Sequence, residues 1–144
     1  RGRNTAGTVA DMALDDHNKY TTCKFIVPNQ IVPPIDVEIE ANTHLTSVSE
    51  ISYKQVAQMA TAGSFSQSLA LYDFSTNSFS STAARVDPIT QVMDSKTLTV
   101  LTDPNRFLGA NGLVRARYQI LQTGPAAFPQ WCHNVNQVTW TLWP

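Results

Sequence analysis

The sequence predicts an all-β fold, a single antiparallel β-sandwich of jelly-roll or immunoglobulin-like type with about eight strands and little helix. Residues 35–41 and 113–121 alternate between apolar and polar side chains, which is the period of a half-buried strand. Short apolar segments elsewhere are separated by turn residues. Charged residues make up only 15% of the chain, and Ser, Thr, Asn and Gln replace them, a mixture that suits extended structure.

The expected strands begin after a weakly patterned N-terminal segment. Residues 21–27 form the first strand, which Pro28-Asn29 closes, and residues 35–41 form the second. In the second strand the apolar residues and the carboxylates occupy opposite parities, so one face is expected to be buried and the other solvated. Residues 48–59 fit a helix as well as a strand, and their setting among strands favours a strand.

A hairpin is expected in the middle of the chain. Its strands, residues 66–75 and 78–83, meet at Thr76-Asn77, where Asn tolerates the positive φ of a tight turn. Residues 85–95 contain Asp87-Pro88 and are expected to form the longest irregular connection.

The last third of the chain returns to strands. Residues 96–102 form a strand, and residues 103–108 form one helical turn with Asp103 as its N-cap and Pro104 in the first position. In the final strand the apolar positions change parity. The first half has them at the odd-numbered positions Trp131, His133 and Val135, and the second half at the even-numbered positions Val138, Trp140 and Leu142. One extra residue near Asn136-Gln137, a β-bulge, would put both sets on one face.

Length and charge limit the functional classes. The 144 residues suit one domain, which we divide into an N-terminal extended segment, 1–16, and a sandwich, 17–144. A net charge of −1 gives no attraction to nucleic acid or to an anionic membrane surface. No apolar stretch approaches the length of a transmembrane helix, so membrane insertion is not expected. The chain opens on Arg1, not Met, and we interpret it as a processed piece.

Two cysteines, Cys23 and Cys132, lie far apart in the sequence. If they pair, the bridge closes a loop of about 100 residues, stabilises the fold by roughly 4–5 kcal/mol and indicates an oxidising compartment. Two ordinary buried thiols are the alternative, and the sequence alone does not decide between them.

Several short motifs occur in a familiar order along nearly the whole chain: Arg1-Gly2-Arg3, Leu14-Asp15-Asp16, Phe25-Ile26-Val27-Pro28-Asn29, Leu71-Tyr72-Asp73-Phe74, Val114-Arg115-Ala116-Arg117, Thr123-Gly124-Pro125 and Gln137-Val138-Thr139-Trp140. This order resembles a β-sandwich module of unassigned activity found, usually C-terminally, in large secreted proteins of environmental bacteria. The resemblance implies an extracellular, non-catalytic module, and it carries over no ligand and no catalytic residue. The two cysteines are not part of the family pattern.

No catalytic constellation is present, and we expect that the chain is not an enzyme. None of the three histidines has a second His or Cys at the spacing of metal ligands, and no serine stands in a nucleophile motif. The carboxylates Asp36, Glu38 and Glu40 could suggest a glycosidase pair, but such a row is more typical of a solvated strand face. Asp11, Asp15 and Asp16 form a weak calcium candidate; no other cofactor or metal is expected.

The aromatic residues provide the best argument for binding. Trp131, Trp140 and Tyr118 have core parity, whereas Trp143 and Tyr72 are expected to be exposed and to contact a partner or a glycan. The first hypothesis is an extracellular or cell-surface structural or adhesive module. It would assemble with copies of itself, as a filament or surface array, by strand addition through residues 1–16. The alternative is a carbohydrate-binding module that binds polysaccharide through exposed aromatics.

Overall fold

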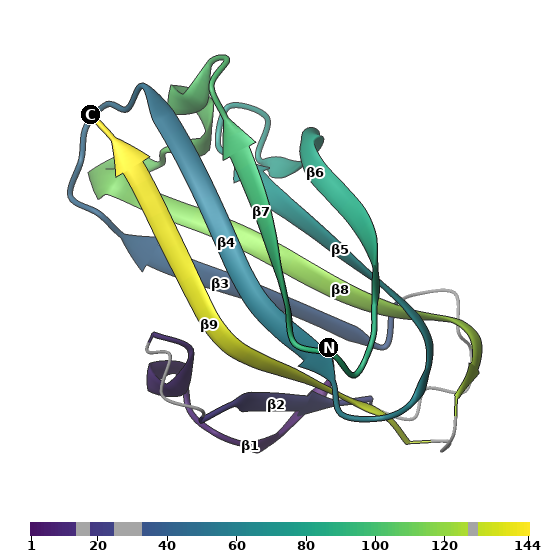
Figure 1. The fold of residues 1–144 in the computed structure, drawn as a ribbon. Coiled ribbons are helices and arrows are strands. Elements are labelled where there is room, and N and C mark those ends of the chain that lie inside the picture. The colour runs from purple at the N-terminus through teal and green to yellow at the C-terminus, as the bar shows by residue number, and fades with distance from the viewer. Residues whose placement is uncertain (14–17, 25–32, 127–129) are drawn as a thin grey trace.

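The computed structural model of the chain describes residues 1–13, 18–24, 33–126 and 130–144. Over these residues the chain forms two antiparallel sheets stacked face to face (Figure 1). Sheet A has the order β1 (Arg3–Ala6), β2 (Tyr20–Cys23), β9 (Cys132–Trp143), β4 (Glu50–Met59), β7 (Asp94–Val100). Sheet B has the order β3 (Ile35–Asn42), β8 (Leu113–Ala126), β5 (Gly63–Asp73), β6 (Ser78–Ile89). The predicted all-β sandwich is confirmed, with nine strands in the described residues.

Helix is limited, over the same residues, to three short 3₁₀ segments: η1 (Val9–Met12), η2 (Pro104–Phe107) and η3 (Ala110–Gly112). None of these helices has the length and apolarity that crossing a membrane requires.

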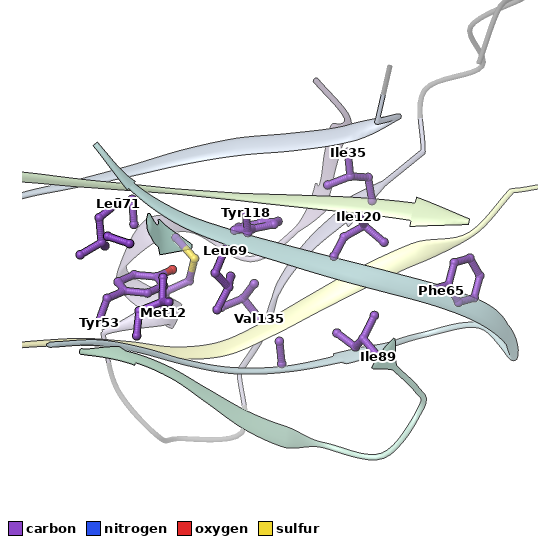
Figure 2. Close-up of a cluster of buried hydrophobic side chains, with 14 of the residues drawn as sticks. Met12, Ile35, Tyr53, Phe65, Leu69, Leu71, Ile89, Tyr118, Ile120 and Val135 are labelled. Carbon is purple, nitrogen blue, oxygen red and sulfur yellow. The ribbon is translucent and has the colours of Figure 1, made fainter. Parts of the chain in front are cut away.

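The hydrophobic core lies between the two sheets, and the alternation seen in the sequence explains its composition. On β4 every second residue from Ile51 to Met59 is buried, and on β8 the same holds from Val114 to Ile120. Figure 2 shows Tyr53, Leu69 and Tyr118 directed into this space. The strand assignment for residues 48–59 is therefore confirmed, apart from the first two residues.

The predicted bulge in the final strand is confirmed. Val138 to Leu142 pair with β4 in one register, and His133 to Val135 pair in a register shifted by one residue, so Asn136 is the extra residue. The shift directs both apolar sets towards sheet B, because side chains alternate along a strand. Trp131 and Val135 are fully buried, and Val138, Trp140 and Leu142 pack against the core.

The prediction of a long irregular connection over residues 85–95 was wrong. Strand β6 continues to Ile89, β7 already begins at Asp94, and only residues 90–93 connect them. Pro88 is accommodated because β6 is an edge strand of sheet B, where one side of the backbone needs no partner. The hairpin before β6 is confirmed, and Asn77 adopts a positive φ of 52° there, but β5 ends at Asp73, so the turn covers residues 74–77 rather than 76–77 alone.

The predicted turn after β7 exists, but its predicted cap does not. Segment η2 begins with Pro104, whereas Asp103 adopts a left-handed φ of 56° and makes no side-chain capping hydrogen bond. The Asp103 side chain therefore does not cap η2, and Asp103 is one of the residues that line a cavity beside it.

The N-terminal segment pairs with its own chain. Strand β1 is hydrogen-bonded to β2, and Arg1 pairs with Asp36 through its side chain and its backbone. Cys23 lies directly opposite Cys132 in the β2–β9 pair, and the two form a disulfide with a sequence separation of 109, so the bridge is confirmed. The docking of residues 1–16 on a neighbouring molecule stays a prediction.

Candidate functional site

The outer face of sheet B gathers aromatic and arginine side chains at one end. On β5, Tyr72 lies between the buried residues Leu71 and Asp73, so its ring points away from the core. The same alternation on β8 turns Arg115 and Arg117 outward, as the sequence pattern indicated. We use the name aromatic face for the group formed by Tyr72, Phe74, Phe79, Arg115 and Arg117.

One row of the aromatic face crosses all four strands of sheet B. Glu40 of β3 lies opposite Arg115 of β8, and their Oε1 and Nε atoms form an ion pair at 2.6 Å. The Arg115 guanidinium carbon lies 4.6 Å from the centroid of the Tyr72 ring. Tyr72 lies opposite Phe79 of β6, with ring centroids 5.1 Å apart at an interplanar angle of 80°. Charge, cation–π and edge-to-face contacts therefore form one continuous row.

A second arginine reaches the same rings from the neighbouring row. Arg117 lies opposite Ala70 on β5, and its guanidinium carbon lies 4.1 Å from the centroid of the Phe79 ring on β6. The small side chain of Ala70 leaves room for this crossing. Arg117 also approaches Asp36, with 3.9 Å between Nε and Oδ1, and Gln119 donates to the same carboxylate at 3.1 Å.

The third ring, Phe74, is fixed by the backbone around it. Its ring meets Tyr72 edge to face at 5.0 Å, and its amide donates to the carbonyl of Arg106 at 2.8 Å. A Cβ at Gly109 would lie 2.6 Å from Cε1 of Phe74. Glycine at position 109 is therefore what allows the ring to pack there.

Positive and negative side chains balance on this face. Of the described residues, Arg1, Arg115 and Arg117 share it with Asp36, Glu38 and Glu40. The pairs are partly exposed, so each contributes little to stability. Their main effect is to hold donors and acceptors in place without giving the face a net charge.

The two aromatic residues singled out in the sequence lie on opposite faces of the sandwich. Tyr72 is half-buried within the aromatic face, whereas Trp143 is 58% exposed at the end of β9, on the outer face of sheet A. Sequence reasoning missed Phe74 and Phe79 as neighbours of Tyr72. A two-residue turn at Thr76-Asn77 would place residue 79 opposite residue 74, whereas the observed turn over residues 74–77 places it opposite Tyr72, so no signal in the sequence pointed to this contact.

The remaining candidates form no site in the described part of the chain. No group of three or more His, Cys, Asp or Glu side chains in residues 1–13, 18–24, 33–126 and 130–144 is placed to hold a metal ion. Of the calcium candidates, Asp15 and Asp16 lie outside the described residues, and Asp11 lies in η1. His133 is buried in the core, and this burial lowers its pKa to about 3.

Comparisons with known proteins support the fold. No protein-family model matches the sequence, and no curated protein matches it. Among solved structures, a CBM4 carbohydrate-binding module superposes with a TM-score of 0.57 at 12% identity, covering 88% of this chain and 72% of the module. The CBM1 module of BiXyn10A in its apo form superposes with a TM-score of 0.53 at 10% identity, covering 98% of this chain and 89% of the module. The chain therefore has the β-sandwich fold seen in carbohydrate-binding modules.

Proposed function

We propose that the chain is a non-catalytic carbohydrate-binding module whose ligand is a neutral polysaccharide lying across the aromatic face. The observation that supports this proposal most directly is the row from Glu40 through Arg115 and Tyr72 to Phe79. The guanidinium groups of Arg115 and Arg117 lie over the rings of Tyr72 and Phe79, and these planar groups stacked on rings offer a surface against which the C–H faces of sugar rings can pack. The fold shared with two carbohydrate-binding modules agrees with this proposal, but the proposal rests on the aromatic face and not on that similarity.

The polar groups beside the rings supply the hydrogen bonds that a sugar needs. Ser68, Gln119 and Asp36 form a connected set, in which Ser68 donates to Gln119 and Gln119 donates to Asp36. These side chains stand on paired strands, so little ordering is required when a ligand binds. Because positive and negative side chains balance on this face, we expect neutral sugars to bind better than uronic acids or sulfated glycans.

A binding screen tests the proposal. The folded chain would be run by affinity electrophoresis through gels that contain neutral glucans, xylans or mannans, with pectin and a sulfated galactan as anionic comparisons. We expect retardation by at least one neutral polysaccharide, loss of that retardation in Phe79→Ala, and normal retardation in Trp143→Ala on the opposite face. Unchanged mobility in every gel would contradict the proposal.

A structural or adhesive role remains a second proposal, and one feature of sheet A favours it. Strand β2 pairs with β9 only from Cys132 to Val135, and no described strand pairs with that edge of β9 from Gln137 to Trp143. A sheet edge without a neighbouring strand can accept a strand from another chain. Size-exclusion chromatography and negative-stain microscopy would test this role, and a monomer at all concentrations would exclude it.

The expected extracellular location is also a proposal. The disulfide between Cys23 and Cys132 is typical of proteins that mature outside a reducing cytosol. Its persistence in material recovered from the native source, measured by thiol alkylation, would support this location.

A further inference from the structure

Two cavities follow β6 where it forms the edge of sheet B. The smaller, about 310 Å³, is lined by Asp73, Thr76, residues 78–82 and Arg106. The larger, about 380 Å³, is lined by Thr82 and Ala83, by residues 99–103, and by Arg106 and Phe107. Because Thr82 and Arg106 line both, the two cavities adjoin, and we name their combination the β6 cleft. Its volume lies in the range of small-ligand sites.

Arg106 lies at the junction of the two cavities, and a buried carboxylate holds its guanidinium in place. Its Nη2 donates to Oδ2 of Asp73, a carboxylate that is only 3% exposed. Asp73 also accepts hydrogen bonds from the amide of Ser75 at 2.9 Å and from its hydroxyl at 2.6 Å. Burial alone would raise the pKa of Asp73, but the hydrogen bonds from Arg106 and Ser75 outweigh it and lower the pKa to about 2. The carboxylate therefore stays ionised and fixes the guanidinium.

The chemistry of the cleft is that of a site for hydroxyl groups. Hydroxyl-bearing residues make up much of its lining: Thr76, Ser78, Ser80, Ser81, Thr82 and Thr102. The charge of Arg106 is compensated by Asp73, and Asp103 adds a further carboxylate to the wall. A cleft with this balance does not favour an anion. The hydroxyls and the fixed guanidinium can exchange hydrogen bonds with an uncharged polyhydroxylated ligand, and the rings of Phe79 and Phe107 can pack against its C–H groups. A sugar unit has this chemistry.

Phe79 connects the cleft to the aromatic face. Its ring packs against Tyr72 and under Arg117 on the outer face of sheet B, and it also lines the smaller cavity. A chain that lies across the aromatic face and extends past Phe79 therefore reaches the cleft without leaving the protein surface.

We infer that a polysaccharide bound to the aromatic face continues around the β6 edge into the β6 cleft, where Arg106 and the surrounding hydroxyls hold further sugar units. This inference rests on the proposed function and adds a second subsite to it. It makes the ligand a chain of several units, because a single sugar cannot occupy both places.

Calorimetry with oligosaccharides of two to six units from the cello, xylo, manno and laminari series tests the inference. For the wild type we expect affinity to rise at least tenfold between the shortest and longest members of one series. Thr82→Trp fills the junction of the two cavities and should remove this rise without weakening the shortest member that binds. Thr141→Trp, an equally large change on the exposed outer face of sheet A, is the matched control.

A second variant covers the case in which Thr82→Trp does not fold. Arg106→Lys keeps a positive charge beside Asp73 but removes the planar fork of donors, and we expect the same loss of length dependence. If both folded variants keep the wild-type length dependence while Tyr72→Ala, which changes the aromatic face and lines neither cavity, loses binding, the cleft is not a subsite and the proposed function stands. If the wild type binds no oligosaccharide and no polysaccharide, both proposals fail.

Discussion

The guanidinium of Arg115 lies over the ring of Tyr72, with 4.6 Å between Cζ and the ring centroid, while its Nε forms an ion pair with Glu40 at 2.6 Å. Arg115 thus couples a carboxylate on the edge strand β3 to an aromatic ring on β5. The contact has two consequences, one for stability and one for binding.

The stability of the fold should show an energetic coupling between Arg115 and Tyr72. Cation–π pairs at partly exposed sites contribute about 0.5–1 kcal/mol. We expect a double-mutant cycle of Arg115→Ala and Tyr72→Ala, measured by urea denaturation, to give a coupling free energy in this range. Strictly additive losses would contradict the contact, and Lys54→Ala, on the outer face of sheet A, provides a variant with no expected coupling to Tyr72.

The two aromatic candidates, half-buried Tyr72 and exposed Trp143, should differ in their effect on polysaccharide binding. Tyr72→Ala removes the central ring of the aromatic face, and we expect at least a tenfold loss of affinity for the neutral polysaccharide that retards the wild type. Trp143→Ala, on the other sheet, should leave that affinity within twofold. The reverse order would move the binding surface to sheet A.

Most of the fold could be predicted because burial on one side of a strand imposes a period of two on the sequence. Strands β3, β4, β8 and β9 all carry this period, and even the bulge at Asn136 left a visible change of parity. The predicted strand over residues 78–83 was too short, because a proline such as Pro88 normally ends a strand. Only the order of strands in the sheet reveals that β6 lies at an edge, where Pro88 is tolerated.

The site was less predictable than the fold, because its members come together only across strands. The sequence predicted that Tyr72 is exposed, but the ring is half-buried, because the pairing of β5 with β8 brings Arg115 against it. The pairing of Asp73 with Arg106 was missed for the same reason, since 33 residues separate them. Local patterns give the direction of a side chain, whereas the register supplies its neighbours.

Removal of the disulfide should destabilise the protein strongly. The bridge between Cys23 and Cys132 spans 109 residues and joins the short strand β2 to β9. Chain entropy alone gives a loss of about 5 kcal/mol for a loop of this length. We expect Cys23→Ser/Cys132→Ser to lower the free energy of unfolding by roughly this amount, as measured by urea denaturation. Dithiothreitol should destabilise the wild type and leave the double variant unchanged; equal stability of the two proteins would contradict the prediction.

Mild acid should destabilise the fold through His133. Burial lowers its pKa from 6.5 to about 3, so the folded protein keeps the imidazole neutral, whereas the unfolded chain takes up a proton below pH 6.5. The unfolded state therefore binds more protons, and stability falls as the pH decreases from 6.5 towards 3. The loss is on the order of 5 kcal/mol over this window at 1.36 kcal/mol per pKa unit. Urea denaturation at pH 7.5 and pH 4.5 would measure the part of this loss that falls above pH 4.5, about 3 kcal/mol, and His133→Gln, which does not titrate, should reduce the dependence.

Deletion of Asn136 should be far more damaging than its substitution. The residue is the extra one in β9, and without it either Val138, Trp140 and Leu142 or His133 and Val135 must turn to the solvent face. A core that loses one of these sets loses several buried side chains, each contributing about 1.5–3 kcal/mol. We expect the deletion variant to be unfolded at 25 °C by circular dichroism, whereas Asn136→Ser keeps the residue count and should stay folded. A folded deletion variant would mean that β9 can shift its register along β4, which the pairing of Tyr53 with Trp140 argues against.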